Sequence, residues 1–292
     1  MKTKLFIISF FLILLTASTS ASVKLSKDAT ISILTCSPGN ELYSLFGHTG
    51  IRVVDKANNM DIVFNYGTFD FATQGFYFKF ARGLLPYQLS CSEFRRFLSS
   101  YIHDERSVYS QTLNLDSIQK QYLMDLLVEN YEPANREYLY NFLYDNCSTR
   151  VRDIIEKSTG NQITWIAQPS TKSFWNLLDE YLGRSPWIQW GIHTILGSPA
   201  TSTATIHEQM FLPDYLMYRL DSAAYNGTPL VQPIETVYEA PEQDLSTPWY
   251  FSPFFVFAIC TLALILFLQK VKSRRLLKAI AIPFFIATGV VG

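Results

Sequence analysis

One cysteine in this chain has neighbours that suit covalent catalysis. Cys147 follows Asn146 at the start of a segment in which Val151, Ile154 and Ile155 recur at helical spacing. Because asparagine is a favourable N-cap, we expect Cys147 to lie in the first turn of a helix. Backbone N–H groups without partners at that end lower the pKa of a thiol and can hold an oxyanion. Cys147 is therefore the candidate nucleophile.

A candidate general base lies far upstream, at the start of a predicted strand. His48 begins the strand expected over residues 48–55, and a turn returns the chain as a second strand over residues 60–66. A hairpin of this kind brings Asn65 close to His48. A base needs a partner on its second ring nitrogen, and Asn65 is the favoured one. Two aspartates are alternative partners: Asp61 and Asp70.

The other cysteines and histidines are weaker candidates. Cys36 ends a strand before a turn, which is a poorer place to stabilise a thiolate, and His193 in an apolar stretch is the alternative base. Cys260 lies in an apolar run. Whether Cys36 and Cys91 form a disulfide stays open, because an extracytoplasmic compartment permits one. With no Cys-x-x-Cys motif and few histidines, we expect no metal site, and we expect no cofactor.

The ends of the chain indicate export and a membrane anchor. Residues 1–21 combine a charged start, an apolar run and a small polar stretch, as in a signal peptide; an uncleaved anchor is the alternative. The uncharged segment 249–268 is long enough to span a bilayer, and basic residues follow it at once, which places that end in the cytoplasm. Residues 279–292 start a second apolar run, so we expect a truncated membrane protein.

The part between these ends is expected to form one domain outside the cytoplasm, over residues 22–225, with an acidic linker over 226–248. The net charge of −1 gives no electrostatic support to nucleic-acid binding. The run 69–89 is rich in aromatic residues. It suits core packing, or an apolar surface that receives lipid, with Lys79 and Arg82 facing phosphates.

Several short segments together resemble one family. They are residues 33–39, 41–43, 46–49, 64–71 and 146–150. This combination resembles the Lnb family, over about residues 28 to 292. The resemblance implies lipoprotein N-acyltransfer, in which a fatty acyl chain moves from a membrane phospholipid to the α-amine of a diacylglyceryl-cysteine through a thioester on Cys147. It also implies an inner-membrane protein whose catalytic domain is periplasmic.

The order of histidine before cysteine is similar to that of lecithin:retinol acyltransferase-like enzymes. The implied fold is α+β: a circularly permuted papain-like (NlpC-type) domain with an antiparallel sheet and an N-terminal nucleophile helix, followed by C-terminal transmembrane helices. The implied catalytic residues are Cys147, His48 and Asn65, although those enzymes often have a second histidine in place of the asparagine. The candidate substrate-binding residues are Asn146, Tyr43, Phe76, Phe78 and Arg150.

Three other functions fit the same features. A peptidoglycan endopeptidase or amidase of this fold needs a polar groove and has little use for a membrane anchor. A phospholipase releases free fatty acid without forming an amide. A non-catalytic membrane scaffold tolerates replacement of Cys147 or His48. The partners expected for the favoured function are a phospholipid donor, a diacylated lipoprotein acceptor and the membrane.

Overall fold

The computed structural model describes residues 23–70, 72–75, 79, 84–166, 169–183, 185–241, 248–270 and 282. The predicted signal peptide and the two predicted substrate-binding residues Phe76 and Phe78 lie outside these residues. The second apolar run, 279–292, also lies outside them except for residue 282.

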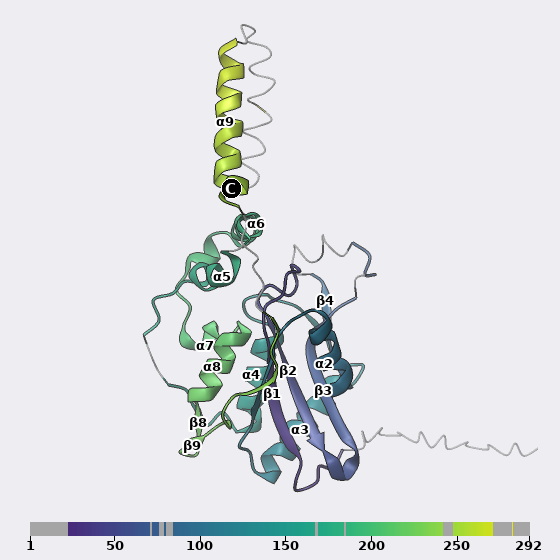
Figure 1. Cartoon of the computed structure of the whole chain (residues 1–292). Coiled ribbons are helices and arrows are strands. Elements are labelled where there is room, and N and C mark those ends of the chain that lie inside the picture. The colour runs from purple at the N-terminus through teal and green to yellow at the C-terminus, as the bar shows by residue number, and fades with distance from the viewer. Residues whose placement is uncertain are drawn as a thin grey trace, which may run out of the picture.

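A seven-stranded antiparallel sheet forms the centre of the domain, in the order β10-β5-β1-β2-β3-β4-β6 (Figure 1). Its strands are β1 (Thr30–Cys36), β2 (His48–Asp55), β3 (Met60–Thr68), β4 (Pro86–Glu93), β5 (Val108–Thr112), β6 (Glu137–Leu139) and β10 (Glu235–Tyr238). A small second sheet contains β7 (Ile163–Thr164), β8 (Ala224–Tyr225) and β9 (Thr228–Pro229).

Helices surround the sheet and extend beyond it. They are α2 (Phe94–His103), α3 (Ser117–Tyr131), α4 (Cys147–Ser158), α5 (Phe174–Leu182), α6 (Pro186–Leu196), α7 (Ile206–Gln209), α8 (Pro213–Ser222) and α9 (Pro253–Lys270). The described residues also form short 3-10 turns: η1 (Lys56–Asn58) between β2 and β3, η2 (Ser198–Thr201) between α6 and α7, and η3 (Trp249–Phe251) before α9.

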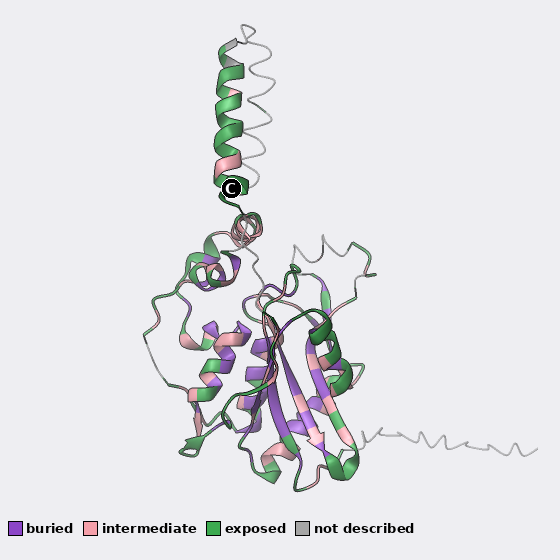
Figure 2. Ribbon diagram, viewed as in Figure 1, coloured by how far each residue is buried: buried purple, intermediate pink, exposed green. Residues whose placement is uncertain are grey.

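Both faces of the sheet are covered, which explains the continuous apolar runs in its central strands. Ile31 and Ile33 of β1 pack on the side of α3, α4 and α8, whereas Leu34 and Cys36 pack on the side of α2. Because successive side chains of a strand point to opposite faces, one strand serves both cores. Figure 2 shows the buried centre formed by the sheet and α4, and the exposed surface of α9.

A third apolar cluster joins the helical extension to the sheet domain. Phe174, Leu177 and Leu178 of α5 pack against Leu143 and Phe211, which lie just before α4 and α8. Helix α6 then follows α5 and stands between the body of the domain and α9 (Figure 1). The residues that precede the two helices α4 and α8 are thereby tied to α5.

The predicted α+β class and antiparallel sheet are confirmed. Helix α4 follows strands β1 to β6, and Cys147 lies at its N-terminal end, as the sequence predicts. The β2–β3 hairpin is also confirmed, with Ile51 opposite Phe64 and Asp55 opposite Met60.

Part of the predicted linker 226–248 belongs to the domain. Strand β10 pairs with β5, with Glu235 opposite Ser110, and the N–H of Ala240 donates a hydrogen bond to Ser107 Oγ at 2.9 Å. An edge strand tolerates the acidic residues and nearby prolines that gave this segment the composition of a linker. The domain therefore continues at least to Ala240.

Helix α9 forms over most of the predicted spanning segment 249–268. It begins at Pro253 rather than at Trp249, because residues 249–251 form the turn η3 and proline favours the first turn of a helix. Within the part of the chain that the structure describes, no helix is both long enough and apolar enough to cross a membrane.

Candidate active site

The position of Cys147 is fixed by a complete capping box. Asn146 Oδ1 accepts hydrogen bonds from the N–H groups of Ser148 at 2.9 Å and Thr149 at 3.0 Å. Thr149 Oγ1 in turn accepts from the N–H of Asn146 at 2.8 Å. Among the described residues, the N–H of Cys147 has no such acceptor. It is therefore the first-turn N–H that remains to hold an oxyanion beside the sulfur.

The Asn146 side chain has no hydrogen-bonding capacity left for a substrate. Its Nδ2 donates to the backbone oxygens of Phe142 at 2.8 Å and Phe211 at 2.9 Å, while Oδ1 accepts two bonds. An amide side chain offers two donors and two acceptor sites, so all of them are used. Asn146 is 3% exposed. Asn146 lines the cavity at Cys147, as its predicted substrate-binding role requires, but these hydrogen bonds favour a positioning role in which it ties two loops to α4.

His48 and Asn65 meet as the hairpin predicts. His48 Nε2 lies 2.5 Å from Asn65 Oδ1. Because an amide oxygen only accepts, Nε2 carries the hydrogen and Nδ1 is left for the other contact of the ring. That contact is Cys147, whose thiol hydrogen-bonds to His48. The alternative partners are used elsewhere, since Asp61 pairs with Arg52 at 2.8 Å and Asp70 accepts from the Ala72 N–H at 2.8 Å.

The environment of Cys147 favours a thiolate. Burial raises the pKa of the Cys147 thiol, but the nearby His48 and hydrogen bonds from His48, the Thr49 backbone and Ser148 outweigh burial and hold it below its ordinary value. Ser148 is itself held by Thr49, whose Oγ1 lies 2.8 Å from Ser148 Oγ. The sheet and the helix thus both contribute to the stabilisation of the sulfur anion.

The other cysteines lack this environment. Burial raises the pKa of Cys36 to about 12 and also raises that of Cys91. Both are free thiols in the structure, which therefore contains no disulfide between Cys36 and Cys91. The alternative base His193 stacks on Trp175, with ring centroids 4.6 Å apart, and does not line the cavity at Cys147.

Gly67 keeps the space between the two reactive side chains open. Its φ is +91°, and a Cβ at this position would lie 3.5 Å from Cys147 Cβ and 3.6 Å from His48 Cε1. A side chain there would be strained by the positive φ and would pack directly against both reactive residues. Sequence reasoning quoted this glycine within a motif but gave it no role, because a positive φ is not visible in residue types alone.

A cavity of about 750 Å³ opens beside Cys147 and His48. Phe46, Phe142 and Leu143 form part of its wall, and Tyr87 stacks on Tyr140 with ring centroids 4.1 Å apart. No Asp, Glu, Lys or Arg occurs among the described residues that line it. The predicted binding residue Tyr43 lies at this cavity and is 54% exposed. The site therefore suits a long apolar ligand.

Helix α6 supplies a wall that sequence reasoning missed. Ile188, Gly191, Ile192, Ile195 and Leu196 line the cavity. The sequence signal was the run of apolar residues over 186–196, which only Gln189, His193 and Thr194 interrupt. Ile188, Ile192 and Leu196 are only partly buried against the third apolar cluster, so this helix keeps apolar surface that suits a ligand, a lipid or a partner.

Arg150 lies away from this cavity. Its guanidinium makes an ion pair with Asp145, at 2.6 Å, and lies 3.6 Å from the centroid of the Tyr138 ring. Arg150 is absent from the described lining of the cavity. Its position favours a structural contact between α4 and β6 over the predicted role in substrate binding.

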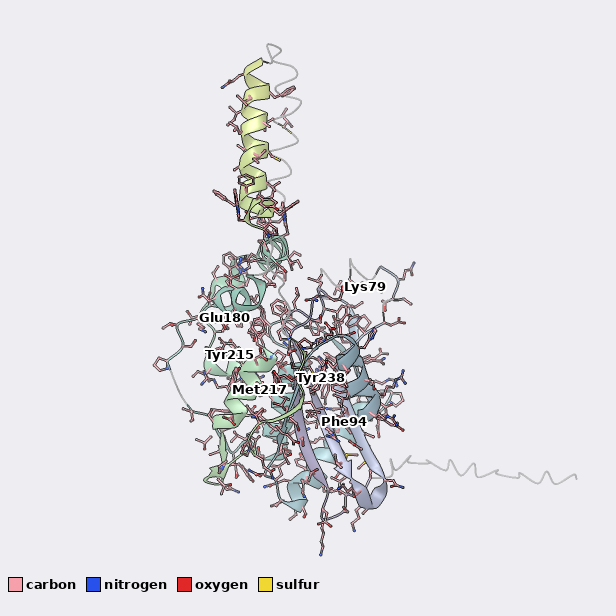
Figure 3. All side chains as sticks on the ribbon, viewed as in Figure 1. Lys79, Phe94, Glu180, Tyr215, Met217 and Tyr238 are labelled. Atoms are coloured by element: carbon pink, nitrogen blue, oxygen red, sulfur yellow. The ribbon has the colours of Figure 1, made fainter. Side chains whose placement is uncertain are left out.

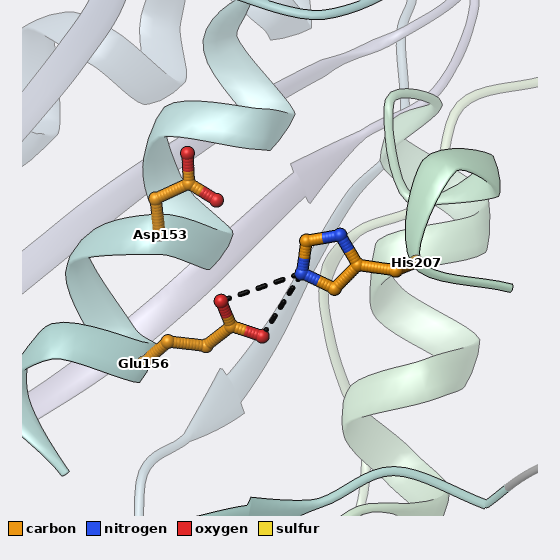
Figure 4. Close-up of side chains that lie close together, drawn as sticks. All are labelled: Asp153, Glu156 and His207. Carbon is orange, nitrogen blue, oxygen red and sulfur yellow. Dashed lines mark hydrogen bonds and ion pairs between the residues drawn. The ribbon is translucent and has the colours of Figure 1, made fainter. Parts of the chain in front are cut away.

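Within the described part of the chain, one group of side chains has donor atoms near enough to share a metal ion: Asp153, Glu156 and His207 (Figure 4). These side chains already have protein partners. Arg152 Nη2 lies 2.6 Å from Asp153 Oδ1, and Trp165 Nε1 donates to Glu156 Oε1 at 2.8 Å. His207 Nε2 lies 3.1 Å from the same Glu156 oxygen. The group is accounted for as an ion-pair network between α4 and α7.

A second cavity, of about 810 Å³, is lined by polar side chains from α5 and α8. Glu180 and Tyr215, both labelled in Figure 3, face each other there, and the Tyr215 hydroxyl donates to Glu180 Oε2 at 2.9 Å. Lys172 Nζ donates to the same carboxylate at 2.5 Å. Neither Cys147 nor His48 belongs to the described lining of this cavity. The two cavities are therefore chemically distinct.

The fold and the site together define a class of protein: an α+β domain with a histidine on a strand, a cysteine at a helix N-terminus and an apolar cavity beside them. The family model described as the Lnb N-terminal periplasmic domain matches residues 17–179, which is more than half of the chain. The chain belongs to this family. No curated protein and no solved structure matches it.

The matched range contains His48, Asn65 and Cys147 and ends within α5. It therefore confirms the resemblance to the Lnb family drawn from the short motifs, over strands β1 to β6 and helix α4, and does not extend to the rest of the range 28–292. Helix α6, which forms one wall of the cavity, follows the matched range.

Proposed function

We propose that this protein is a cysteine-dependent lipoprotein N-acyltransferase, which moves a fatty acyl chain from a phospholipid to the α-amine of a diacylglyceryl-cysteine. One observation carries the proposal: a thiol with a lowered pKa, paired with His48, opens into an apolar cavity of about 750 Å³. Membership in the Lnb family supports it.

The first half of the reaction loads the enzyme. The Cys147 thiolate attacks the ester carbonyl carbon of a phospholipid, and the negative charge moves to the carbonyl oxygen, where the Cys147 N–H donates a hydrogen bond. The C–O bond of the ester then breaks. The proton that His48 took from the thiol passes to the leaving oxygen, so a lysophospholipid departs and an acyl thioester remains.

The second half transfers the chain. The neutral amine of the diacylated lipoprotein attacks the thioester carbonyl, His48 accepts a proton from the nitrogen, and the C–S bond breaks to release the thiolate. An α-amine titrates near pH ~8, so a useful fraction is neutral at pH ~7. Asn65 holds the His48 ring so that Nδ1 faces the sulfur during both halves. No cofactor is required.

The cavity favours an acyl substrate over a wall peptide. A peptidoglycan stem carries charges and amides, and burying them against an uncharged aromatic wall leaves polar groups without partners, which is costly. A hydrocarbon chain has no such groups. Its burial is favourable by about 0.8 kcal/mol for each methylene. The endopeptidase or amidase alternative therefore has less support from the lining.

The remaining parts of the proposal concern location and topology. We place the catalytic domain in the periplasm with its cavity at the outer face of the inner membrane. Phe254 of α9 is 84% exposed and Trp249 of η3 is 71% exposed, which suits contact with lipid. The order of the His48 strand before the Cys147 helix supports a circularly permuted papain-like arrangement.

Product analysis tests the proposal against its alternatives. Full-length protein in membranes is given a phospholipid with a labelled acyl chain and a diacylated lipopeptide, and the products are identified by mass spectrometry. We expect one labelled amide for each lysophospholipid formed. Cys147→Ala should abolish both products, whereas Cys91→Ala, which replaces a cysteine outside the cavity, should leave them unchanged.

Three results would contradict the proposal. Free fatty acid without amide indicates a phospholipase, and altered wall crosslinks with unchanged lipoprotein N-termini indicate a peptidase. If Cys147→Ala and His48→Ala both keep normal lipoprotein N-termini in cells that depend on this protein, the domain is a scaffold.

A further inference from the structure

The middle of helix α6 contains a glycine that packing does not require. Gly191 lies inside the helix, where glycine is unfavourable because it has the most backbone freedom to lose. A Cβ built at Gly191 meets no heavy atom within 4 Å. Its φ is not in the left-handed region, so the backbone does not call for glycine either. The missing side chain therefore needs another reason.

The position of Gly191 supplies that reason. It lines the cavity that holds Cys147, on the same wall as Ile188, Ile192 and Ile195. A side chain at position 191 would start from this lining and would meet no other residue within 4 Å of its Cβ. In Figure 1, α6 stands beyond the ends of the sheet strands, and α4 lies against the sheet. Cys147 and Gly191 belong to different walls of one cavity.

Helix α6 is held rigidly enough to act as a fixed wall. Trp187 and Trp190 pack against Phe257 of α9, with ring centroids 5.6 Å and 5.4 Å apart. Trp187 Nε1 also donates a hydrogen bond to the backbone oxygen of Phe251 at 2.6 Å. Ile188, Ile192 and Leu196 of α6 also pack against the third apolar cluster, which includes α5. A wall held by these contacts can limit the length of a bound chain.

We propose that Gly191 sets the length of the acyl chain that the cavity accepts, by leaving room on the α6 wall for the distal part of a long chain. This inference rests on the proposed acyl transfer and adds a specificity determinant to it. A larger side chain at position 191 would occupy that room and exclude the last methylenes of a long chain. The reacting groups would stay in place.

The size of the effect follows from hydrocarbon burial. Each methylene that no longer fits costs about fourfold in kcat/KM, from the free energy of burying one methylene group. Gly191→Ala should lower kcat/KM for the longest chains by about fourfold, and Gly191→Leu should lower it further. Short chains, which do not reach α6, should react as in the unchanged protein.

The experiment measures kcat/KM of the full chain for phospholipids with one headgroup and short, medium or long saturated acyl chains. The variants are Gly191→Ala and Gly191→Leu. Thr194→Leu is the matched control, because Thr194 is on the same helix and does not belong to the described lining of the cavity. Thermal melting confirms folding, and alanine in place of a helical glycine should raise the melting temperature.

The inference is supported if Gly191→Leu shifts the preference to shorter chains and Thr194→Leu does not. It is overturned if Gly191→Leu has the same chain-length preference as the unchanged protein. It is also overturned if Gly191→Leu lowers kcat/KM by the same factor for every chain length. If the unchanged protein transfers acyl chains in the same assay, either result for Gly191→Leu concerns only the role of Gly191 and leaves the proposed function standing. If no phospholipid of any length yields a thioester or an amide, the acyltransferase proposal fails and this inference fails with it.

Discussion

Replacing Asn146 should destabilise the protein more than any exposed asparagine would. Its side chain caps α4 through two backbone N–H groups and satisfies the carbonyls of Phe142 and Phe211. Asn146→Ala removes all four bonds at a site that is 3% exposed. Because nothing from solvent can readily replace them, the cost should appear in the free energy of unfolding.

The magnitude follows from the two kinds of bond. Loss of an N-cap costs about 1 kcal/mol, and each buried carbonyl left without its partner adds about 1 kcal/mol at the low end of the usual range. The sum is about 3 kcal/mol, which lowers the melting temperature by about 6–12 °C for a domain of this size. Asn146→Asp separates the two parts, because aspartate keeps the cap acceptor but loses both donors.

Thermal unfolding of the full chain, followed by near-UV circular dichroism, measures this difference. Asn135→Ala is the control, since Asn135 is exposed and donates to the backbone oxygen of Glu129 at 2.9 Å. The control should change stability by no more than about 0.5 kcal/mol. If Asn146→Ala melts at the same temperature as the control, Asn146 does not hold α4 in the way described here. If the cap contributes independently of the two donated bonds, the melting temperature of Asn146→Asp should lie between those of Asn146→Ala and the unchanged protein.

Three further predictions concern the pair of reactive residues and one buried carboxylate. Alkylation followed against pH should modify Cys147 at lower pH than Cys91 or Cys36, and His48→Ala should move the Cys147 profile to higher pH; an unchanged profile would refute the lowering of its pKa by His48. Gly67→Ala should reduce turnover at least tenfold while the protein stays folded, because it strains a φ of +91° and packs directly against both reactive residues; full activity would show that the space is not needed. Hydrogen bonds from Ser26, Asn58 and Ala57 lower the pKa of Asp55 from 3.8 to about 2, so its stabilising effect is complete above pH 3.8 and is lost as the pH falls toward about 2. Acid unfolding of Asp55→Asn should lack this part of the pH dependence, and an identical pH profile would contradict the assignment.

The parts of the site that depend on local patterns could be predicted from the sequence. Asn146 followed by residues at helical spacing placed Cys147 in the first turn of α4, and the predicted hairpin of residues 48–55 and 60–66 placed Asn65 beside His48. Both inferences need only the preferences of a cap and the geometry of a hairpin. The positions of Cys147, His48 and Asn65 could therefore be predicted from short stretches of the chain.

The parts of the fold and the site that depend on packing could not be predicted from the sequence. Asn146 looked available for substrate, but one of its partners is the backbone oxygen of Phe211, which residue types do not reveal. Arg150 also looked available, but the turn before α4 and the position of β6 bring Asp145 and Tyr138 against its guanidinium. Strand β10 had the composition of a linker because an edge strand and a linker tolerate the same residues. The apolar pattern of α6 likewise did not say which surface the helix faces.

Trapping of the covalent intermediate tests the central claim most directly. Full-length protein is mixed with phospholipid that carries a labelled acyl chain, without any lipopeptide acceptor, and acid-quenched peptides are mapped by mass spectrometry. We expect a hydroxylamine-labile acyl group on Cys147, which is absent in His48→Ala and is removed when the amine acceptor is added. Transfer of the label to the acceptor with no acyl group ever found on Cys147, or an acyl group on another residue, would contradict it.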